Sequence, residues 1–180
     1  MNWHVVDTNV LIVASGEHPE SPFSSSNHPV AHPEYAEQVY DWVNELEASP
    51  ERMVLDSDDV IYGEYRNKLT EQDYGLLVLR EKMERGQVDY VGLVWEEGPG
   101  NPEPVAVLQG NLSAVIHDRS DRKMVAACIT ARADYGQTSI VNACDTDWID
   151  WEENLQQEGI VVIQLIEEWV RAKWLEKQQN

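Results

Sequence analysis

The alternation of short apolar segments with helical patterns is the feature that most constrains the fold of this 180-residue chain. Four such segments are WHVV at 3–6, RMVL at 52–55, SIVN at 139–142 and IVVIQL at 160–165. Short runs of this kind are typical of strands buried on both faces of a parallel sheet. Because helical patterns separate them, the sequence predicts an α/β fold with a mainly parallel sheet.

The spacing of apolar residues predicts helices over 34–48, 58–69, 71–85, 121–133 and 167–177. Ser120 is the expected N-cap of the fourth helix. Residues 16–33 have the composition of a loop, and residues 87–117 indicate an irregular β-rich excursion or hairpin broken by EEGPGNPEP. We find neither a linker nor an internal repeat. We therefore expect a single domain over residues 1–180, with a C-terminal strand and helix at about 160–177.

The charge balance bears on binding partners. The chain has 33 acidic residues against 13 Lys and Arg, a formal net charge of −20. A protein that holds nucleic acid alone usually presents a basic face, because neutralising phosphates releases counterions. Attraction to a polyanion would therefore come from metal ions with a few local Arg and Lys contacts, or from a basic protein partner. High solubility explains the same charge equally well.

The sequence also bears on location. No apolar run approaches the roughly 20 residues of a membrane-spanning helix, and the segment MNWHVVDTN does not resemble a secretory signal. The two cysteines, Cys128 and Cys144, have no disulfide or metal spacing. We expect a cytoplasmic protein that does not enter a membrane.

Acidic residues follow the predicted strands at the positions where parallel sheets bind ligands. Asp7 comes directly after the first strand, and Asp145 and Asp147 follow the strand at 139–142. Glu64 and Asp121 lie on helices beside apolar positions. A cluster of carboxylates needs a cation to neutralise it, and hard divalent cations prefer oxygen ligands. These acids together predict a site for Mg²⁺ or Mn²⁺.

Each acid also has a structural explanation. Asp121 suits the first turn of a helix, Glu64 can pair with Lys68, and Asp145 and Asp147 are common turn residues. Asp7 is the hardest to explain without a ligand, because it interrupts an apolar run. The prediction of a metal site therefore depends on the set. The tryptophans at 148, 151, 169 and 174 are more typical of a core or a partner interface.

Four segments resemble the motifs of PIN-domain nucleases. VVDTNVLI at 5–12 is similar to their opening motif, and DVIYGEYRNKL at 59–69 to their second acidic motif. SDRKMVAACITA at 120–131 resembles the third, and VNACDTDW at 141–148 resembles the closing Asp-x-Asp-aromatic segment. The motifs occur in family order over most of the chain. The resemblance implies a three-layer α/β/α sandwich.

The resemblance also implies roles for individual residues. Asp7, Glu64, Asp121 and Asp145 would form a catalytic site for Mg²⁺ or Mn²⁺, with Asp147 contributing and Asn9 supporting. The family often has Ser or Thr where this chain has Ala143, so Asn142 is the candidate for that polar role. Asp118 is the alternative to Asp121 as third ligand. Arg119, Arg122 and Lys123 are candidate phosphate contacts, although salt bridges to acidic neighbours explain them equally well.

The expected function is that of a metal-dependent endonuclease. A divalent cation lowers the pKa of a water toward neutrality and stabilises charge on a phosphate, so no nucleophilic side chain is needed. The resemblance implies RNA more than single-stranded DNA, roles in toxin–antitoxin systems, defence or RNA processing, an antitoxin as one partner, and a homodimer; the charge adds a basic protein as the other candidate partner. The alternative is a non-catalytic acidic module that binds a basic partner. Haloacid dehalogenase-like and Toprim-like sites fit less well, because Asn9 and Asp7 stand where they require Asp and Glu.

Overall fold

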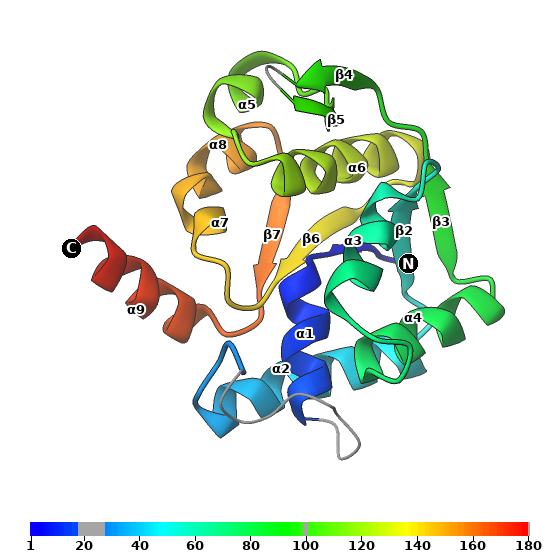
Figure 1. Ribbon diagram of the computed structural model, residues 1–180, viewed down its shortest axis with the longest axis vertical. Coiled ribbons are helices and arrows are strands. Elements are labelled where there is room, and N and C mark those ends of the chain that lie inside the picture. Colours follow the sequence, from blue (N-terminus) through cyan, green and yellow to red (C-terminus); the bar gives the residue numbers. More distant parts are fainter. Residues whose placement is uncertain (18–27, 99–100, 180) are drawn as a thin grey trace.

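A central parallel sheet organises the molecule. The computed structural model describes residues 1–17, 28–98 and 101–179. Within these residues the sheet has five strands in the order β3-β2-β1-β6-β7, and every neighbouring pair is parallel (Figure 1). The strands are β1 (Trp3–Val6), β2 (Arg52–Asp56), β3 (Val88–Val91), β6 (Thr138–Asn142) and β7 (Val161–Gln164). The predicted α/β class is confirmed, and all four predicted strands are present.

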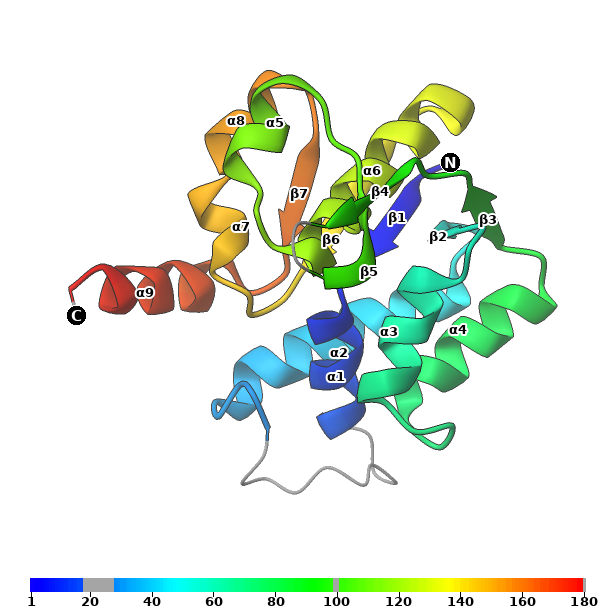
Figure 2. The same cartoon turned by 45° about the horizontal axis from the view of Figure 1, so that its top comes forward.

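Helices cover both faces of the sheet in a three-layer α/β/α sandwich (Figures 1 and 2). Adjacent residues of β1 show the two faces, because side chains alternate along a strand. Trp3 stacks on Tyr135 of α6 (Arg119–Tyr135), whereas His4 meets Trp42 of α2 (Pro33–Ala48) edge-on. The α2 layer also includes α1 (Thr8–Glu17) and α4 (Tyr74–Glu84), and α3 (Val60–Lys68) packs against α1 and β2.

The core lies between these layers. Val5 and Val6 of β1 and Ile140 and Val141 of β6 are fully buried, as expected for strands covered on both faces. Burial of such side chains supplies the main favourable term in folding. None of the helices in residues 1–17, 28–98 and 101–179 combines the length and apolar character that crossing a membrane requires.

The predicted excursion at 87–117 is wrong in two details. Its first strand, β3, extends the central sheet by pairing with β2, so only β4 (Trp95–Gly98) and β5 (Asn101–Ala106) form a separate antiparallel hairpin. Residues predicted as β-rich near its end form α5 (Gly110–Val115). The apolar residues of α5 are too few for a helical period to stand out from a strand pattern.

Other elements also differ in detail from the prediction. The loop predicted over 16–33 overlaps the end of α1, and its part at 18–27 lies outside the described residues. Asp118, not Ser120, is the N-cap of α6, because its carboxylate accepts a hydrogen bond from the backbone N–H of Ser120. Two short helices after β6, α7 (Asp147–Asp150) and α8 (Glu152–Gln157), were not predicted. The last helix, α9 (Glu167–Gln178), follows β7 as expected and extends from the body (Figures 1 and 2).

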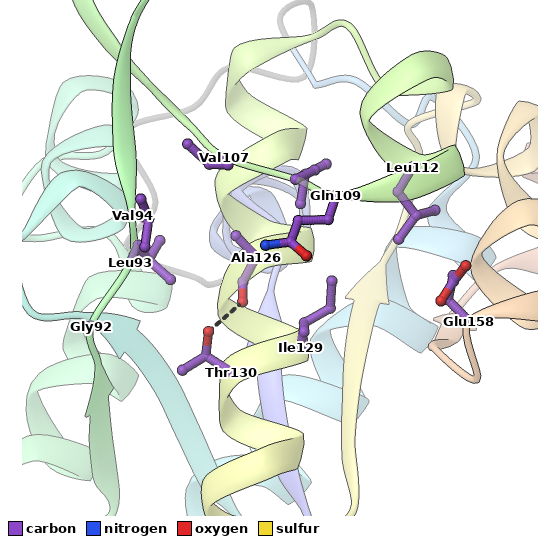
Figure 3. A pocket seen from close by; sticks show the side chains of 11 residues that line it. Gly92, Leu93, Val94, Val107, Gln109, Leu112, Ala126, Ile129, Thr130 and Glu158 are labelled. Carbon is purple, nitrogen blue, oxygen red and sulfur yellow. Dashed lines mark hydrogen bonds between the residues drawn. The ribbon is translucent and has the colours of Figure 1, made fainter.

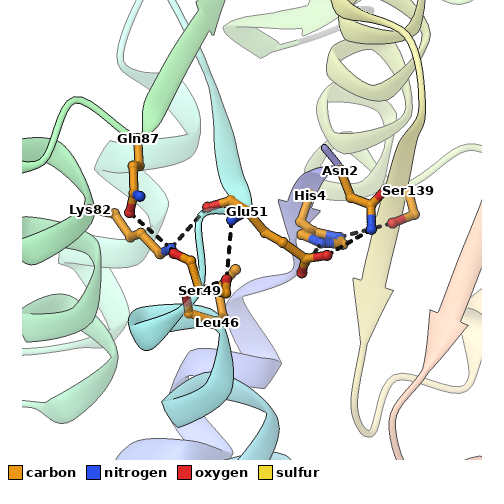
Figure 4. Close-up of polar contacts among 8 residues, drawn as sticks. All are labelled: Asn2, His4, Leu46, Ser49, Glu51, Lys82, Gln87 and Ser139. Atoms are coloured by element: carbon orange, nitrogen blue, oxygen red, sulfur yellow. Dashed lines mark hydrogen bonds and ion pairs between the residues drawn. The ribbon is translucent and has the colours of Figure 1, made fainter.

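A network of buried polar groups lies at the amino edge of the sheet (Figure 4). The fully buried ammonium of Lys82 donates to the carbonyls of Ser49 (2.8 Å) and Glu51 (2.9 Å) and to Oε1 of Gln87 (3.1 Å). The ring of His4 hydrogen bonds with Ser139 Oγ and Glu51 Oε2, each at 3.0 Å. We call these residues the amino-edge network. Each donor of the Lys82 ammonium has a protein acceptor.

Candidate metal centre

Three aspartates converge at the opposite, carboxyl edge of the sheet. Asp7 follows β1, Asp145 lies in the turn after β6, and Asp121 belongs to the first turn of α6. One carboxylate oxygen from each lies within 4.8 Å of the others. We call Asp7, Asp121 and Asp145 the aspartate cluster. The parallel pairing of β1 with β6, which aligns Val6 with Val141, brings two of the three together across more than 130 residues of sequence.

Asp7 is held at both of its oxygens. Its Oδ1 accepts a hydrogen bond from the backbone N–H of Asn9 (3.0 Å), at the start of α1. Its Oδ2 accepts one from the indole N–H of Trp148 (2.7 Å), a side chain that is fully buried. The sequence indicated a core or interface role for Trp148 and missed this contact. The aromatic residue of the closing motif was the available signal, but its partner is 141 positions away.

Asn9 and Asn142 join the turn after β6 to the start of α1. Asn9 Nδ2 donates to Asn142 Oδ1 (2.9 Å), and Asn9 Oδ1 accepts from the backbone N–H groups of Ala143 (2.9 Å) and Cys144 (3.1 Å). Asn142 Nδ2 donates to the carbonyl of Asp145 (2.9 Å). Both asparagines therefore hold backbone around the cluster.

Asp147 lies beside the cluster and has a partner of its own. Its carboxylate contacts the ammonium of Lys177 on α9 at 2.6 Å. Its backbone N–H donates to Asp145 Oδ1 at 2.9 Å, which orients that carboxylate. The structure therefore connects Asp147 to the cluster through its backbone, while its side chain pairs with a lysine.

The sequence left Asp121 and Asp118 as alternative third ligands, and the two residues lie in different surroundings in the structure. Asp121 is only 6% exposed and belongs to the aspartate cluster. Asp118 is exposed and caps α6. Asp118 still affects the centre, because its negative charge is one of those that raise the pKa of Asp121.

Electrostatics show that the cluster is costly without a cation. Burial, together with the charges of Asp7 and Asp145, raises the pKa of Asp121 to about 8. Burial likewise raises the pKa of Asp7 to about 7, although the hydrogen bonds from Asn9 and Trp148 oppose the shift. Burial also raises the pKa of Asp145. Three carboxylates that repel one another in a buried place provide the all-oxygen donor set that a hard divalent cation prefers.

Glu64 is near the cluster but is engaged by other groups. Its Oε2 contacts the ammonium of Lys123, and its Oε1 accepts a hydrogen bond from the hydroxyl of Thr8. Burial raises the pKa of Glu64, but the charge and hydrogen bond of Lys123 outweigh burial and leave this pKa below its ordinary value. The sequence did not single out Thr8, although it lies beside Asp7 in the opening motif.

The two candidate phosphate contacts beside Lys123 hold parts of the fold together. Arg122 is buried, and its guanidinium donates to the carbonyls of Ala106 (2.9 Å) and Ile116 (3.1 Å). It therefore ties the segment around α5 to α6. Arg119 lies 3.9 Å from Glu103. Arg122 also lies 3.8 Å from Glu96, and Lys123 pairs with Glu64, so each of the three cations has an acidic neighbour.

A hollow lies away from the aspartate cluster (Figure 3). It has a volume of about 370 Å³ between α6, the segment after β3 and the segment before α5. Leu93, Val94, Leu112 and Ile129 make much of its lining apolar, and none of the three aspartates lines it. The chemistry that the sequence predicts is therefore expected at the aspartate cluster and not in this pocket.

Comparison of the chain with protein families, curated proteins and solved structures finds no match.

Proposed function

We propose that this chain is a metal-dependent phosphodiester hydrolase, an endoribonuclease that acts on single-stranded RNA. The observation that carries the proposal is the convergence of Asp7, Asp121 and Asp145 to within 4.8 Å at the carboxyl edge of a parallel sheet. These three residues would hold Mg²⁺ or Mn²⁺. A divalent cation in such a place supplies Lewis acidity toward a phosphate oxygen and lowers the pKa of water.

The chain's own groups have separate tasks in this proposal. Asn9 and Trp148 orient the two oxygens of Asp7, and the backbone N–H of Asp147 orients Asp145. The ammonium of Lys123, held by Glu64, is a donor for a phosphate oxygen of the substrate. Because these groups are positioned by the fold, little reorganisation is needed when charge develops on the phosphate.

The choice of RNA rests on sequence resemblance. The four motifs at 5–12, 59–69, 120–131 and 141–148 are similar to those of PIN-domain nucleases in the same order. That resemblance favours RNA over single-stranded DNA, and it favours a role in a toxin–antitoxin system, in defence or in RNA processing. The geometry of the aspartate cluster supports metal-dependent hydrolysis of either nucleic acid.

A cleavage assay tests the proposal. Single-stranded RNA and DNA of one sequence are incubated with the wild type in Mg²⁺, Mn²⁺ or EDTA, beside Asp7→Asn. We expect RNA cleavage that requires the metal and falls about 100-fold or more in Asp7→Asn. Asp134→Asn is the matched control, because it makes the same change at an exposed position of α6. Cleavage that survives both EDTA and Asp7→Asn would refute the proposal.

A non-catalytic acidic module is the second candidate. The net charge of −20 and the engagement of Arg122 and Lys123 by groups of the protein favour it, since few cations near the centre are left for a polyanion. Absence of cleavage in every condition, together with tight and salt-sensitive binding of a peptide rich in lysine and arginine, would support this candidate over the nuclease.

A further inference from the structure

The buried ion pair between Lys123 and Glu64 separates the acids of the centre into two groups. The side chains are only 7% and 19% exposed, and the second oxygen of Glu64 is taken by the hydroxyl of Thr8. Both oxygens of Glu64 thus face protein donors. Asp7 also accepts two hydrogen bonds, but both of its donors are neutral, whereas Glu64 is paired with a cation. One oxygen of each member of the aspartate cluster lies within 4.8 Å of the others.

The charges of the centre lead to the same division. Asp7, Glu64, Asp121, Asp145 and Asp147 face two ammonium groups, those of Lys123 and Lys177. Each lysine pairs with an acid outside the aspartate cluster. When all of these groups are ionised the formal charge is −3, and the exposed Asp118, whose charge also acts on Asp121 and Asp145, brings it to −4. One divalent cation at the aspartate cluster therefore leaves −2. A second cation bound by Glu64 would have to displace the ammonium of Lys123, which is only 7% exposed.

We propose that the centre holds one divalent cation at Asp7, Asp121 and Asp145, and that Lys123, fixed by Glu64, occupies the place of a second. Glu64 is then a positioning residue for the ammonium and not a metal ligand. This inference rests on the proposed function, because it assumes that the aspartate cluster binds a metal. Lys123 would then contact the substrate, because an ammonium beside a metal site can donate to a second oxygen of the phosphate that the metal binds.

Counting bound Mn²⁺ tests this division without any measurement of cleavage. Mn²⁺ is titrated into the metal-free full chain at pH 8, and binding is followed by calorimetry and by the electron paramagnetic resonance of free Mn²⁺. We expect one ion per chain in the wild type and in Lys123→Arg. We expect two in Lys123→Gln, because Glu64 is released. Asp121→Asn should bind no detectable Mn²⁺, whereas Glu64→Gln should keep one ion with an affinity within about tenfold of the wild type.

The double variant Glu64→Gln with Lys123→Gln is the control for loss of structure in the single variants. It removes both partners of the ion pair and so leaves no buried charge unpaired. It should bind one ion with an affinity close to that of the wild type. Two ions in the wild type, one ion in Lys123→Gln, or loss of the ion from Glu64→Gln or the double variant overturns the inference alone. No Mn²⁺ binding by the wild type overturns the proposed metal centre as well.

Discussion

The two edges of the central sheet both bury ionisable side chains, but they differ in the partners that these side chains have. At the amino edge, Lys82 meets three protein acceptors, and His4 hydrogen bonds on both sides of its ring (Figure 4). At the carboxyl edge, three aspartates face one another, and the two nearby lysines pair with other acids. The first arrangement completes the fold, while the second leaves a charge that a ligand can neutralise.

This difference marks the amino-edge network as structural and the aspartate cluster as the candidate functional site. A buried polar group stabilises the fold only when its partners are present, and unpaired buried charge is costly. A position at the carboxyl edge does not by itself make an aspartate a candidate metal ligand. Asp56 also ends a strand at this edge. Its carboxylate accepts three backbone N–H groups, from Asp58, Val60 and Ile61, and therefore begins α3.

The largest expected effect is loss of stability at the amino edge. Lys82→Ala would leave the carbonyls of Ser49 and Glu51 without their donor and would open a cavity. We expect the free energy of unfolding to fall by about 3 kcal/mol, measured by urea denaturation. Arg80→Ala, an exposed change on the same helix, should alter it by less than about 0.5 kcal/mol. Equal effects of the two variants would show that the network is not stabilising.

The second effect is stabilisation of the carboxyl edge by metal. Mn²⁺ at about 100 times its dissociation constant should stabilise the wild type by about 2.7 kcal/mol. For a chain of this size the unfolding midpoint should rise by about 5–10 °C. The rise should be smaller at pH 6 than at pH 8, because protons compete for the carboxylates. Asp121→Asn should show no rise, and an equal rise in that variant would place the metal elsewhere.

The third effect is a pH dependence that differs between the edges. The pKa values of Asp7 and Asp121 in the folded chain are about 7 and about 8, against 3.8 for an ordinary aspartate. The folded chain therefore binds these protons more tightly than the unfolded chain. The resulting loss of stability is absent below pH 4, develops as the pH rises from about 4 to 8, and is complete above 8.

Urea denaturation in EDTA measures this loss. Between pH 5 and pH 8 we expect the free energy of unfolding of the wild type to fall by at least about 2 kcal/mol relative to the double variant Asp7→Asn with Asp121→Asn. Lys82 behaves oppositely, because burial lowers its pKa to about 8. Its cost is complete below pH 8 and disappears toward pH 10.5, outside this window. A difference that does not change with pH would contradict the repulsion within the aspartate cluster.

The smallest effect is the gain from removing one carboxylate of the cluster. In EDTA at pH 8, Asp121→Asn should raise the free energy of unfolding by about 1 kcal/mol, because one repulsive charge is removed. Thermal unfolding should show a midpoint about 2–4 °C higher. Asp134→Asn should leave the midpoint unchanged, since that residue is exposed. A lower midpoint in Asp121→Asn would mean that the charged form supports the fold.

Local patterns were enough to predict the class of fold and part of the centre. The short apolar segments and helical periods predicted the parallel sheet, and Asp7 and Asp145 were predicted from their positions after strands. These features depend on neighbouring residues, so they can be recognised in the chain itself. The pairing of β3 with β2 and the helix α5 could not, because the β3 pattern does not show which strand it joins and the α5 pattern is short and ambiguous.

The sequence by itself determined which acids are available at the carboxyl edge, and the tertiary structure decided what each one contacts. Pairing of β1 with β6 brings Asp7 beside the turn that carries Asp145, and packing of α6 adds Asp121. The same packing places Lys123 beside Glu64, for which the resemblance implied a metal ligand, and it buries Lys82 within α4. Contacts between residues many positions apart depend on strand order and helix packing, which no local pattern encodes.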